Sequence, residues 1–250
     1  MTKNITIAVT NDGGLADPPP LIYSVTPAPL NDGDVVNLLP DSGPLGNDGL
    51  KVGTPIFKTN VVNGYPVVRF SGDACFNLKN IIPCVAPYCC FAVLKPATPT
   101  SNLAALGGGA GGNPCCHLNA GGAYYSVDQS GYITGPWSWT GFHVFFIRNF
   151  GPSGFYFYVD GGDSSNQVGY GGGAASNISD FTSLGLPQGN DGDWVETIFY
   201  NTDVGLSVPD RSNICKTLGM KYGIPVTTGV VIDPLSVAGV AGWWKADSLL

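Results

Sequence analysis

A single complete helix signal, in a chain otherwise rich in strand and turn signals, limits the fold of this sequence more than any other feature. Ser207 can cap the helix by accepting a backbone N–H bond, and Asp210 stands at the third helical position, as in a capping box. Gly223 suits the left-handed conformation that ends a helix, and Pro225 prevents its continuation. One apolar stripe runs between these ends and consists of Ile214, Leu218 and Tyr222. The pattern predicts one helix of about four turns attached to a β protein.

Strand signals fill most of the remaining chain. Trp194–Tyr200, shortly before the helix, is a run of aromatic and β-branched residues that predicts a strand buried on both faces. Further strands are predicted at 65–70, 89–94, 103–106, 117–127, 142–148 and 155–159. Asn-Asp-Gly and similar turns separate the runs at intervals of about ten residues, as in β-sandwiches. Because no helices are present for parallel crossovers, we expect antiparallel sheets.

Composition excludes several classes of partner. Charged residues make up only 12% of the chain, whereas Gly (36) and Pro (20) are abundant, and such a surface suits a protein covered by neighbours in an assembly. The net charge of −7 and the lack of Lys/Arg runs argue against nucleic acid, whose affinity comes largely from phosphate contacts. No apolar stretch is long enough to span a membrane, and the start of the chain lacks the apolar core of a secretory signal.

The cysteines are expected to be reduced and buried. They are Cys75, Cys84, Cys89, Cys90, Cys115, Cys116 and Cys215, an odd number in a chain without a secretory signal. Cys89 and Cys90 lie in a strand-like run, as do Cys115 and Cys116, and neighbours in a strand point to opposite faces. Cys115-Cys116-His117 also lacks the second ligand pair of a zinc site. We therefore predict no metal at the cysteines.

Six segments occur in an order typical of one superfamily. They are PVVRFSGDACFNL, CCFAVLKPAT, FHVFFIRNFG, FYFYVDGG, GDWVETIFYNTD and DRSNICKTLGMKYGI. The series resembles laminin-G-like, concanavalin A-like jelly-roll domains, especially modules of bacterial surface proteins and phage structural proteins. The resemblance covers roughly residues 21–226. It implies an all-β fold, an antiparallel jelly-roll β-sandwich with one short C-terminal helix outside it.

The chain divides into three predicted parts. Residues 1–20 are expected to form an extended N-terminal arm, and residues 21–226 the jelly-roll domain. Residues 227–250 begin as a turn-rich linker and end in WWKADSLL, which resembles the first strand of such a module. Either the chain continues into another repeat, or this strand completes this domain or a neighbouring one. We favour the first alternative, a truncated tandem array.

Glu196 is the single glutamate, against seventeen aspartates. Glycosidases need two carboxylates beside the scissile bond, and enzymes of this superfamily usually carry them as glutamates of one strand. Glu196 has no acid two or four residues on, and the alternative pair, Asp160 and Asp163, lies in a glycine turn. In the non-enzymatic modules that the sequence resembles, an acid in this strand ties a neighbouring loop. We therefore interpret Glu196 as structural, and the sequence predicts that the chain is not an enzyme.

Other catalytic patterns are weaker. Residues 107–112 satisfy G-x-G-x-x-G, but Asn-Pro and a strand follow where a phosphate site needs a helix N-terminus. His117 and His143 lie in apolar strand runs, and the chain has no G-x-S-x-G elbow. We interpret His143 as a strand histidine with a local hydrogen-bond partner rather than as a base.

Calcium is the one metal for which the chain offers a donor pattern. The NDGD sequences at 31–34 and 190–193 supply carboxylates, the ligands that Ca²⁺ prefers. Neither follows the spacing of a calcium loop, and Asn-Asp-Gly is a turn signal in its own right. We predict turns at both positions and no cofactor, with Ca²⁺ as the alternative.

Trp137 and Trp139 are the best candidates for contact with a sugar. They stand two residues apart in an extended, glycine-bounded stretch, so their rings share one side. Tyr170, in the glycine-rich VGYGGG segment, is a weaker candidate. Aromatic rings beside hydrogen-bonding groups are typical of glycan sites. The competing interpretation, which we favour, is that the two tryptophans fill the end of the sandwich.

These observations favour a structural or adhesion module of a large assembly, without enzymatic activity. A phage virion, as a capsid-decorating or tail protein assembled in the cytoplasm, is the expected location, with the cell surface as the alternative. The expected partners are other structural subunits, including copies of the chain itself. The alternative function is a carbohydrate-binding module that recognises cell-surface or matrix glycans through Trp137, Trp139 and Tyr170.

Overall fold

The fold is mostly β, with two antiparallel sheets and one α-helix in the part of the chain that the structure describes. The computed structural model describes residues 29–83, 87–98, 103–108, 114–119, 123–126, 131–134, 141–150, 155–164, 167–171, 180–185, 190–200, 207–226, 229, 231–237 and 240–249. The arm predicted at 1–20 lies outside these residues. The prediction of two antiparallel sheets with one helix is confirmed.

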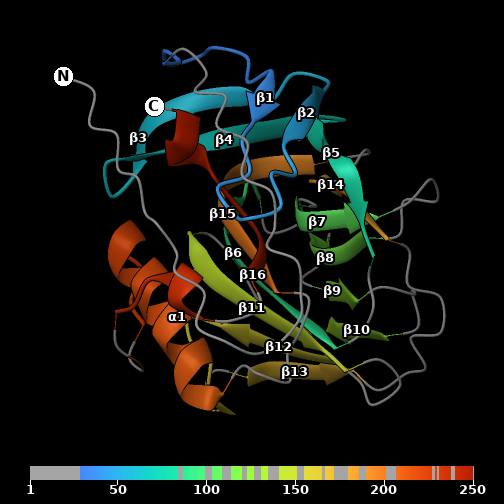
Figure 1. The fold of residues 1–250 in the computed structure, drawn as a ribbon, viewed down its shortest axis with the longest axis vertical. Helices are drawn as coiled ribbons and strands as arrows, with labels where there is room; N and C mark the ends of the chain where they lie inside the picture. The colour runs from blue at the N-terminus through green and yellow to red at the C-terminus, as the bar shows by residue number, and fades with distance from the viewer. Residues whose placement is uncertain are drawn as a thin grey trace.

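Sheet A has the strand order β13-β12-β11-β6-β15-β4-β3, with β16 beside β15 (Figure 1). Its strands are β3 (Ile56–Val62), β4 (Tyr65–Gly72), β6 (Tyr88–Pro96), β11 (His143–Asn149), β12 (Phe155–Val159), β13 (Gln167–Gly171), β15 (Asn190–Tyr200) and β16 (Val240–Lys245). The first half of β15 pairs with β4 and its second half with β16, while β6 runs along its other edge. β15 is therefore an interior strand of this sheet that pairs with three others.

Sheet B has the order β1-β2-β5-β14-β7-β8-β9-β10. Its strands are β1 (Leu38–Leu39), β2 (Gly49–Val52), β5 (Cys75–Ile82), β7 (Leu103–Gly108), β8 (Pro114–Asn119), β9 (Ala123–Ser126), β10 (Gly131–Thr134) and β14 (Phe181–Leu184). The strand predicted at 117–127 is divided into β8 and β9, which are antiparallel partners. All pairings in both sheets are antiparallel among the described strands.

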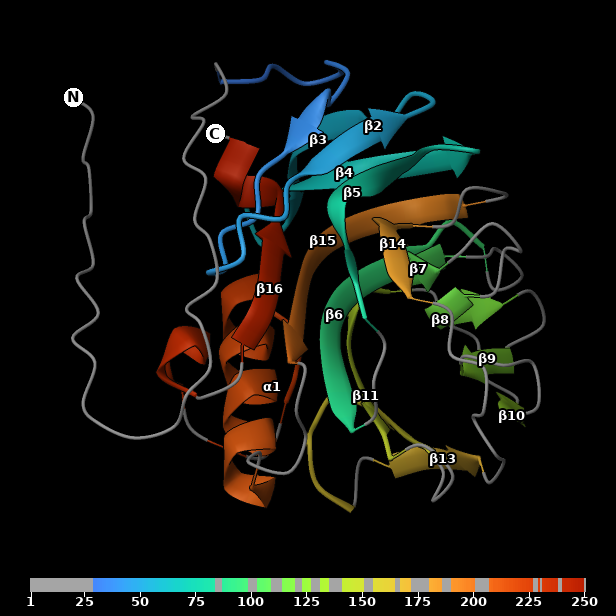
Figure 2. The same ribbon diagram turned by 45° about the vertical axis from the view of Figure 1, so that its right-hand side comes forward.

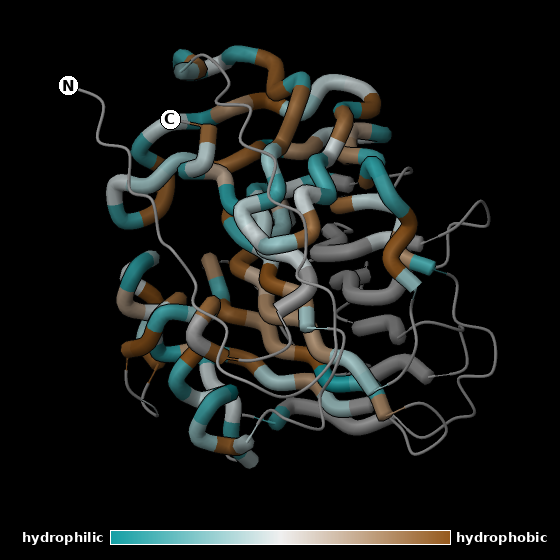
Figure 3. Tube along the Cα trace, in the orientation of Figure 1, coloured by the Kyte–Doolittle hydropathy of each residue, from teal (hydrophilic) through white to brown (hydrophobic). Residues whose placement is uncertain are grey.

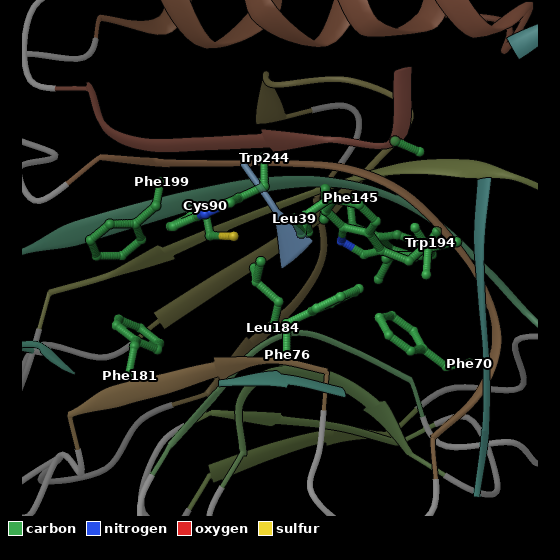
Figure 4. Packing of buried hydrophobic residues seen from close by; sticks show 14 of the residues in the cluster. Leu39, Phe70, Phe76, Cys90, Phe145, Phe181, Leu184, Trp194, Phe199 and Trp244 are labelled. Atoms are coloured by element: carbon green, nitrogen blue, oxygen red, sulfur yellow. The ribbon is translucent and has the colours of Figure 1, made fainter. Parts of the chain in front are cut away.

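The two sheets pack face to face over one apolar cluster (Figure 4). Sheet A contributes Phe145, Trp194 and Phe199 to it, and sheet B contributes Phe76 and Phe181. Each of these five side chains is at most 1% exposed. Burial of apolar surface at this interface is the main force that holds the sheets together.

The helix α1 (Val208–Tyr222) covers the other face of sheet A (Figure 2). Apolar segments alternate with polar ones along it (Figure 3), and its apolar stripe, Ile214, Leu218 and Tyr222, packs on the sheet. Ser207 caps it in a capping box with Asp210, and Gly223 ends it in the left-handed conformation at φ 69°. The helix predicted from these residues is confirmed.

Burial on both faces explains the continuous apolar runs of sheet A. In β6, Cys90 and Ala92 belong to the cluster between the sheets, while Cys89 and Phe91 belong to the cluster beneath α1. Residues 192–200 of β15 are buried throughout, as the sequence predicted. The free cysteines Cys75, Cys89, Cys90 and Cys215 are buried, and Cys89 and Cys90 point to opposite faces as expected. Cys84 and the side chains of Cys115 and Cys116 lie outside the described part.

The tail segment is built into the same β unit. β16 pairs with β15 from Glu196↔Lys245 to Tyr200↔Val240, and the short 3₁₀ helix η4 (Ala246–Leu249) follows it. Trp244 and Leu249 are fully buried in the cluster between the sheets. A second 3₁₀ turn, η3 (Pro234–Ser236), lies in the segment that connects α1 with β16. In this structure the segment predicted to begin another repeat is thus a strand of this domain.

Candidate functional site

Glu196 is the centre of the best-connected buried polar cluster that the structure describes. Its side chain lies on the helix side of β15 and is 1% exposed. It accepts hydrogen bonds from the Tyr222 hydroxyl, from Trp243 Nε1 and, at 2.9 Å, from Lys221 Nζ. Lys221 Nζ also lies 3.1 Å from Asp247 Oδ2 in η4. The lone glutamate therefore joins β15 to α1, β16 and η4.

The ionisation states of the partners follow from this environment. Burial, and then the charge of Glu196, raises the pKa of Tyr222, so the hydroxyl stays a donor. Burial alone would lower the pKa of Lys221, but the charges of Glu196 and Asp247 outweigh it, and the pKa of Lys221 is raised. Every partner thus donates to Glu196, as a buried carboxylate requires.

This cluster is closed to a substrate, because Glu196 and Tyr222 are only 1% and 2% exposed. The structural interpretation of Glu196 agrees with these contacts. The elements that it ties are the helix and the tail strand, whereas the sequence suggested a neighbouring loop.

A second buried acid, Asp41, holds the other edge of β16. Asp41 Oδ1 accepts from the backbone N–H groups of Gly43 at 2.7 Å and Trp243 at 3.0 Å, and Oδ2 accepts from that of Asn47 at 2.9 Å. Burial raises the pKa of Asp41, although these three N–H donors oppose the shift. Trp244 Nε1 donates to the Asn47 carbonyl at 3.0 Å. The loop from Asp41 to Asn47 therefore accepts hydrogen bonds from both Trp243 and Trp244 of β16.

His143 and Asp160 form a partly exposed acid–base pair at one end of sheet A. His143 Nδ1 lies 2.7 Å from Asp160 Oδ2, and their side chains are 26% and 27% exposed. Asp160 Oδ1 accepts from the Val144 backbone N–H at 2.9 Å, which fixes the carboxylate. Asp160 has φ 54° and directly follows β12. His143 thus has a local hydrogen-bond partner, as the interpretation of it as a strand histidine expects.

The turn that carries Asp160 approaches the helix closely. A Cβ atom on Gly162 would lie 2.6 Å from the Arg211 carbonyl carbon and 2.7 Å from the Ser212 nitrogen. Arg211, in the first turn of α1, lies 5.8 Å from the Phe146 ring centroid and 5.9 Å from that of Tyr158. The glycine therefore lets the turn pack directly on the helix backbone.

Of the residues predicted to contact a sugar, Tyr170 is in the described part of the backbone, whereas Trp137 and Trp139 lie outside it. Tyr170 is in β13 directly opposite Tyr156 of β12. Tyr156 packs edge-to-face on Phe150, with ring centroids 5.8 Å apart, and the Arg148 guanidinium lies 4.5 Å from the Phe150 centroid. All three side chains are partly exposed. We name Arg148, Phe150 and Tyr156 the aromatic platform. The sequence predicts 142–148 and 155–159 as strands but not which of their side chains share a surface, so the platform could not be predicted from it.

The two NDGD sequences do not bring their carboxylates together. Asp34 Oδ2 accepts from the backbone N–H of Asn31 at 2.7 Å, which closes a turn. Asp32 pairs with Lys58 at 2.9 Å, and Asp193 is held by Arg69 at 2.7 Å. Within the described residues, no three His, Cys, Asp or Glu side chains are grouped so that they could hold a metal ion. In the same residues, no helix is long and apolar enough to cross a membrane.

Comparison with known proteins gives a likeness to a solved structure. No family model matches the sequence, and no curated protein matches it. The fold is similar to a solved structure of Trypanosoma rangeli sialidase in complex with sialic acid, with a TM-score of 0.43 and 14% sequence identity. The match covers 74% of this chain and 33% of the sialidase chain, so this chain spans about a third of that protein's length.

The prediction that the chain is not an enzyme is contradicted by this match, because the similar structure is that of an enzyme. We withdraw the prediction. It rested on the lack of a second glutamate near Glu196, and a missing glutamate pair excludes only one arrangement of catalytic acids. The match itself transfers no residue role and no substrate to this chain.

Proposed function

We propose that the chain is an adhesion module that binds carbohydrate on the helix side of sheet A, and that its fold is a laminin-G-like, concanavalin A-like jelly roll. Two antiparallel sheets with a single helix outside them support the proposal for the fold. The ordered series of segments over residues 21–226 supports the superfamily. The proposal for the function rests on the aromatic platform.

The observation that carries the function is the combination of two partly exposed rings with a guanidinium. Phe150 and Tyr156 meet edge-to-face, and Arg148 lies over the Phe150 ring. Rings of this kind offer a flat apolar face to the C–H groups of a sugar, and the Tyr hydroxyl and Arg N–H groups offer hydrogen bonds to its hydroxyls. A ligand of mixed character, such as a sugar ring, matches this surface better than a purely apolar ligand would.

Tyr170, a site residue predicted from the sequence, is in β13, the strand next to the platform. Because Tyr170 is directly opposite Tyr156 across β12 and β13, a ligand on Tyr156 would lie within reach of the Tyr170 position. Arg148 and Tyr156 are in the adjacent strands β11 and β12, and Phe150 directly follows β11. Sites on strands are held more rigidly than sites on loops.

A glycan array with the full chain tests the proposal. The Phe150→Ala variant is expected to bind any glycan found on the array with about tenfold lower affinity, because it lacks one aromatic ring on which the sugar can stack. Met220→Ala is the matched control, since Met220 is 60% exposed on α1 and is not a platform residue. Unchanged binding by Phe150→Ala, combined with loss in Trp137→Ala, would place the sugar in the 135–140 segment and contradict the platform.

A role as a structural subunit of a virion is a second candidate. Leu50 in β2 and Ile81 in β5, on neighbouring strands of sheet B, are 56% and 60% exposed, which suits a face covered by another subunit. Sedimentation of the full chain tests this candidate. A species that stays monomeric at high concentration, with no change in Leu50→Ser, would count against it.

A further inference from the structure

A row of charged side chains crosses the outer face of sheet A, at the ends of its strands. Arg69 in β4 is directly opposite Asp193 in β15, which is directly opposite Lys95 in β6. Phe142, just before β11, continues the row, because His143 is opposite Leu94. Strands in a sheet are about 4.8 Å apart, so the Cα atoms of Arg69 and Lys95 are about 10 Å apart.

Arg69 is held firmly and yet presents donors to solvent. Its Nε and Nη2 donate to the two carboxylate oxygens of Asp193 at 2.7 and 3.0 Å. The Asp193 side chain is 7% exposed and the Arg69 side chain 49%. A guanidinium has five N–H groups, and two are used here, so the outer edge of Arg69 keeps donors for a ligand. The buried carboxylate therefore orients the guanidinium and leaves its outer edge accessible.

Lys95 supplies a second cation. Its Nζ lies 5.6 Å from the Phe142 ring centroid, and among the described residues no carboxylate pairs with it. The ammonium sits on a flexible four-carbon stem, so it can turn from the ring toward a bound group. Both Lys95 and Phe142 are partly exposed.

The nearby acids are engaged elsewhere. Asp193 is neutralised by Arg69, and Asp32 is paired with Lys58 at 2.9 Å. Asp191, two residues before Asp193 and therefore on the same side of β15, has contacts of its own and stands one row further toward the strand end. The row of Arg69, Asp193 and Lys95 thus carries one net positive charge, in a chain whose net charge is −7.

We propose that Arg69 and Lys95 form a binding site for an anionic group, a carboxylate or a sulfate, on the outer face of sheet A. The free N–H groups of the Arg69 guanidinium can pair with two oxygens of such a group, and the Lys95 ammonium adds a second positive charge from β6. Phe142 provides an apolar surface for the carbon skeleton that carries the group. The site lies at the opposite end of β11 from the aromatic platform, so it does not depend on the proposed function.

The test is an NMR titration of the ¹⁵N-labelled full chain with sodium glucuronate, sodium sulfate and glucose. We expect saturable shifts at Arg69, Lys95 and Phe142 with glucuronate, sulfate or both, and none with glucose. The two anions separate a carboxylate ligand from a sulfate ligand. The affinity is expected to fall as salt is added, since the contacts are exposed.

Three variants locate the site. Lys95→Gln is expected to lower affinity about tenfold, because it removes one charge-assisted bond and no internal ion pair. Arg69→Lys keeps a charge against Asp193 but loses the planar edge, so it is expected to lower affinity similarly. Lys51→Gln, an exposed cation in β2, is the matched control. An absence of saturable shifts, equal shifts with glucose, or equal losses in Lys95→Gln and Lys51→Gln would overturn the proposal.

Discussion

At the residue scale, Glu196 is a buried carboxylate that joins three elements of the fold. It takes hydrogen bonds from Lys221 and Tyr222 of α1 and from Trp243 of β16, and it is 1% exposed. A buried carboxylate without donors costs several kcal/mol, so each partner is needed. The cluster therefore couples the position of the helix to that of the tail strand.

Glu196→Gln is expected to lower the free energy of unfolding by about 3 kcal/mol, because the amide cannot accept from all three donors and leaves the Lys221 charge partly unpaired. Urea unfolding of the full chain measures the loss. Asp32→Asn is the matched control, since it removes an ion pair with Lys58 whose Asp32 side chain is 53% exposed. Asp32→Asn should leave stability unchanged within error. Equal losses in the two variants would contradict the structural role of Glu196.

For single residues, the sequence can indicate a structural role but not the partners that carry it out. The lack of a neighbouring acid and the resemblance together pointed to a structural Glu196. Its partners could not be predicted, because Tyr222 and Trp243 are 26 and 47 residues away and only the tertiary fold brings them near. For the same reason, Arg148 and Tyr156 could be assigned to strands but not to a shared surface.

At the element scale, elements defined by nearby residues could be predicted from the sequence, whereas the positions of strands that depend on long-range pairing could not. The helix could be predicted from Ser207 to Gly223 because caps and stripe depend only on nearby residues. The position of the tail strand β16 could not be predicted, because it depends on pairing with β15 and on a hydrogen bond to Asp41, which is 202 residues from Trp243. From the sequence, WWKADSLL could be either the first strand of a following repeat or a strand that completes this domain or a neighbouring one.

Trp244→Ala tests whether β16 belongs to this domain. Trp244 is fully buried between the sheets, so its truncation is expected to cost about 4 kcal/mol of unfolding free energy. Met220→Ala, at a 60% exposed position, is the control, and it should change stability by less than about 0.5 kcal/mol. Thermal and urea unfolding measure both variants. A loss near zero in Trp244→Ala would mean that the strand is not part of this core.

At the scale of the whole molecule, several buried groups hold their protons more tightly in the folded chain. Burial raises the pKa of Cys75 to about 11, with a smaller effect of Asp73, and burial also raises the pKa values of Cys215, Tyr200 and Tyr222. The charges of Glu196 and Asp247 outweigh burial and raise the pKa of Lys221. In each case the unfolded chain releases its proton at a lower pH, so rising pH favours unfolding.

Stability is therefore expected to fall by on the order of 5 kcal/mol between about pH 7 and about pH 10.5, where unfolded cysteine and then tyrosine and lysine lose protons. Urea unfolding in the presence of a reductant measures the change. Tyr200→Phe removes one titrating group, so its stability should fall less steeply over the same range. A flat profile from neutral to alkaline pH would show that these groups are not buried as described.

The whole fold could be predicted only in outline. Antiparallel sheets follow from strands, turns and the shortage of helices, but the order of strands does not. β14 (Phe181–Leu184), for example, lies between β5 and β7, which begin 106 and 78 residues earlier in the chain. Alternation within a strand shows which residues share a face, yet it does not show which strand is the neighbour.

The proposed function requires that a sugar binds to the platform of Arg148, Phe150 and Tyr156. The most direct measurement is a map of amide shifts in the ¹⁵N-labelled full chain, titrated with the strongest ligand from the glycan array. We expect saturable shifts at residues 148–150, 156 and 170, and their loss in Phe150→Ala. Shifts confined to other parts of the chain, or no binding to any glycan of a broad array, would contradict it.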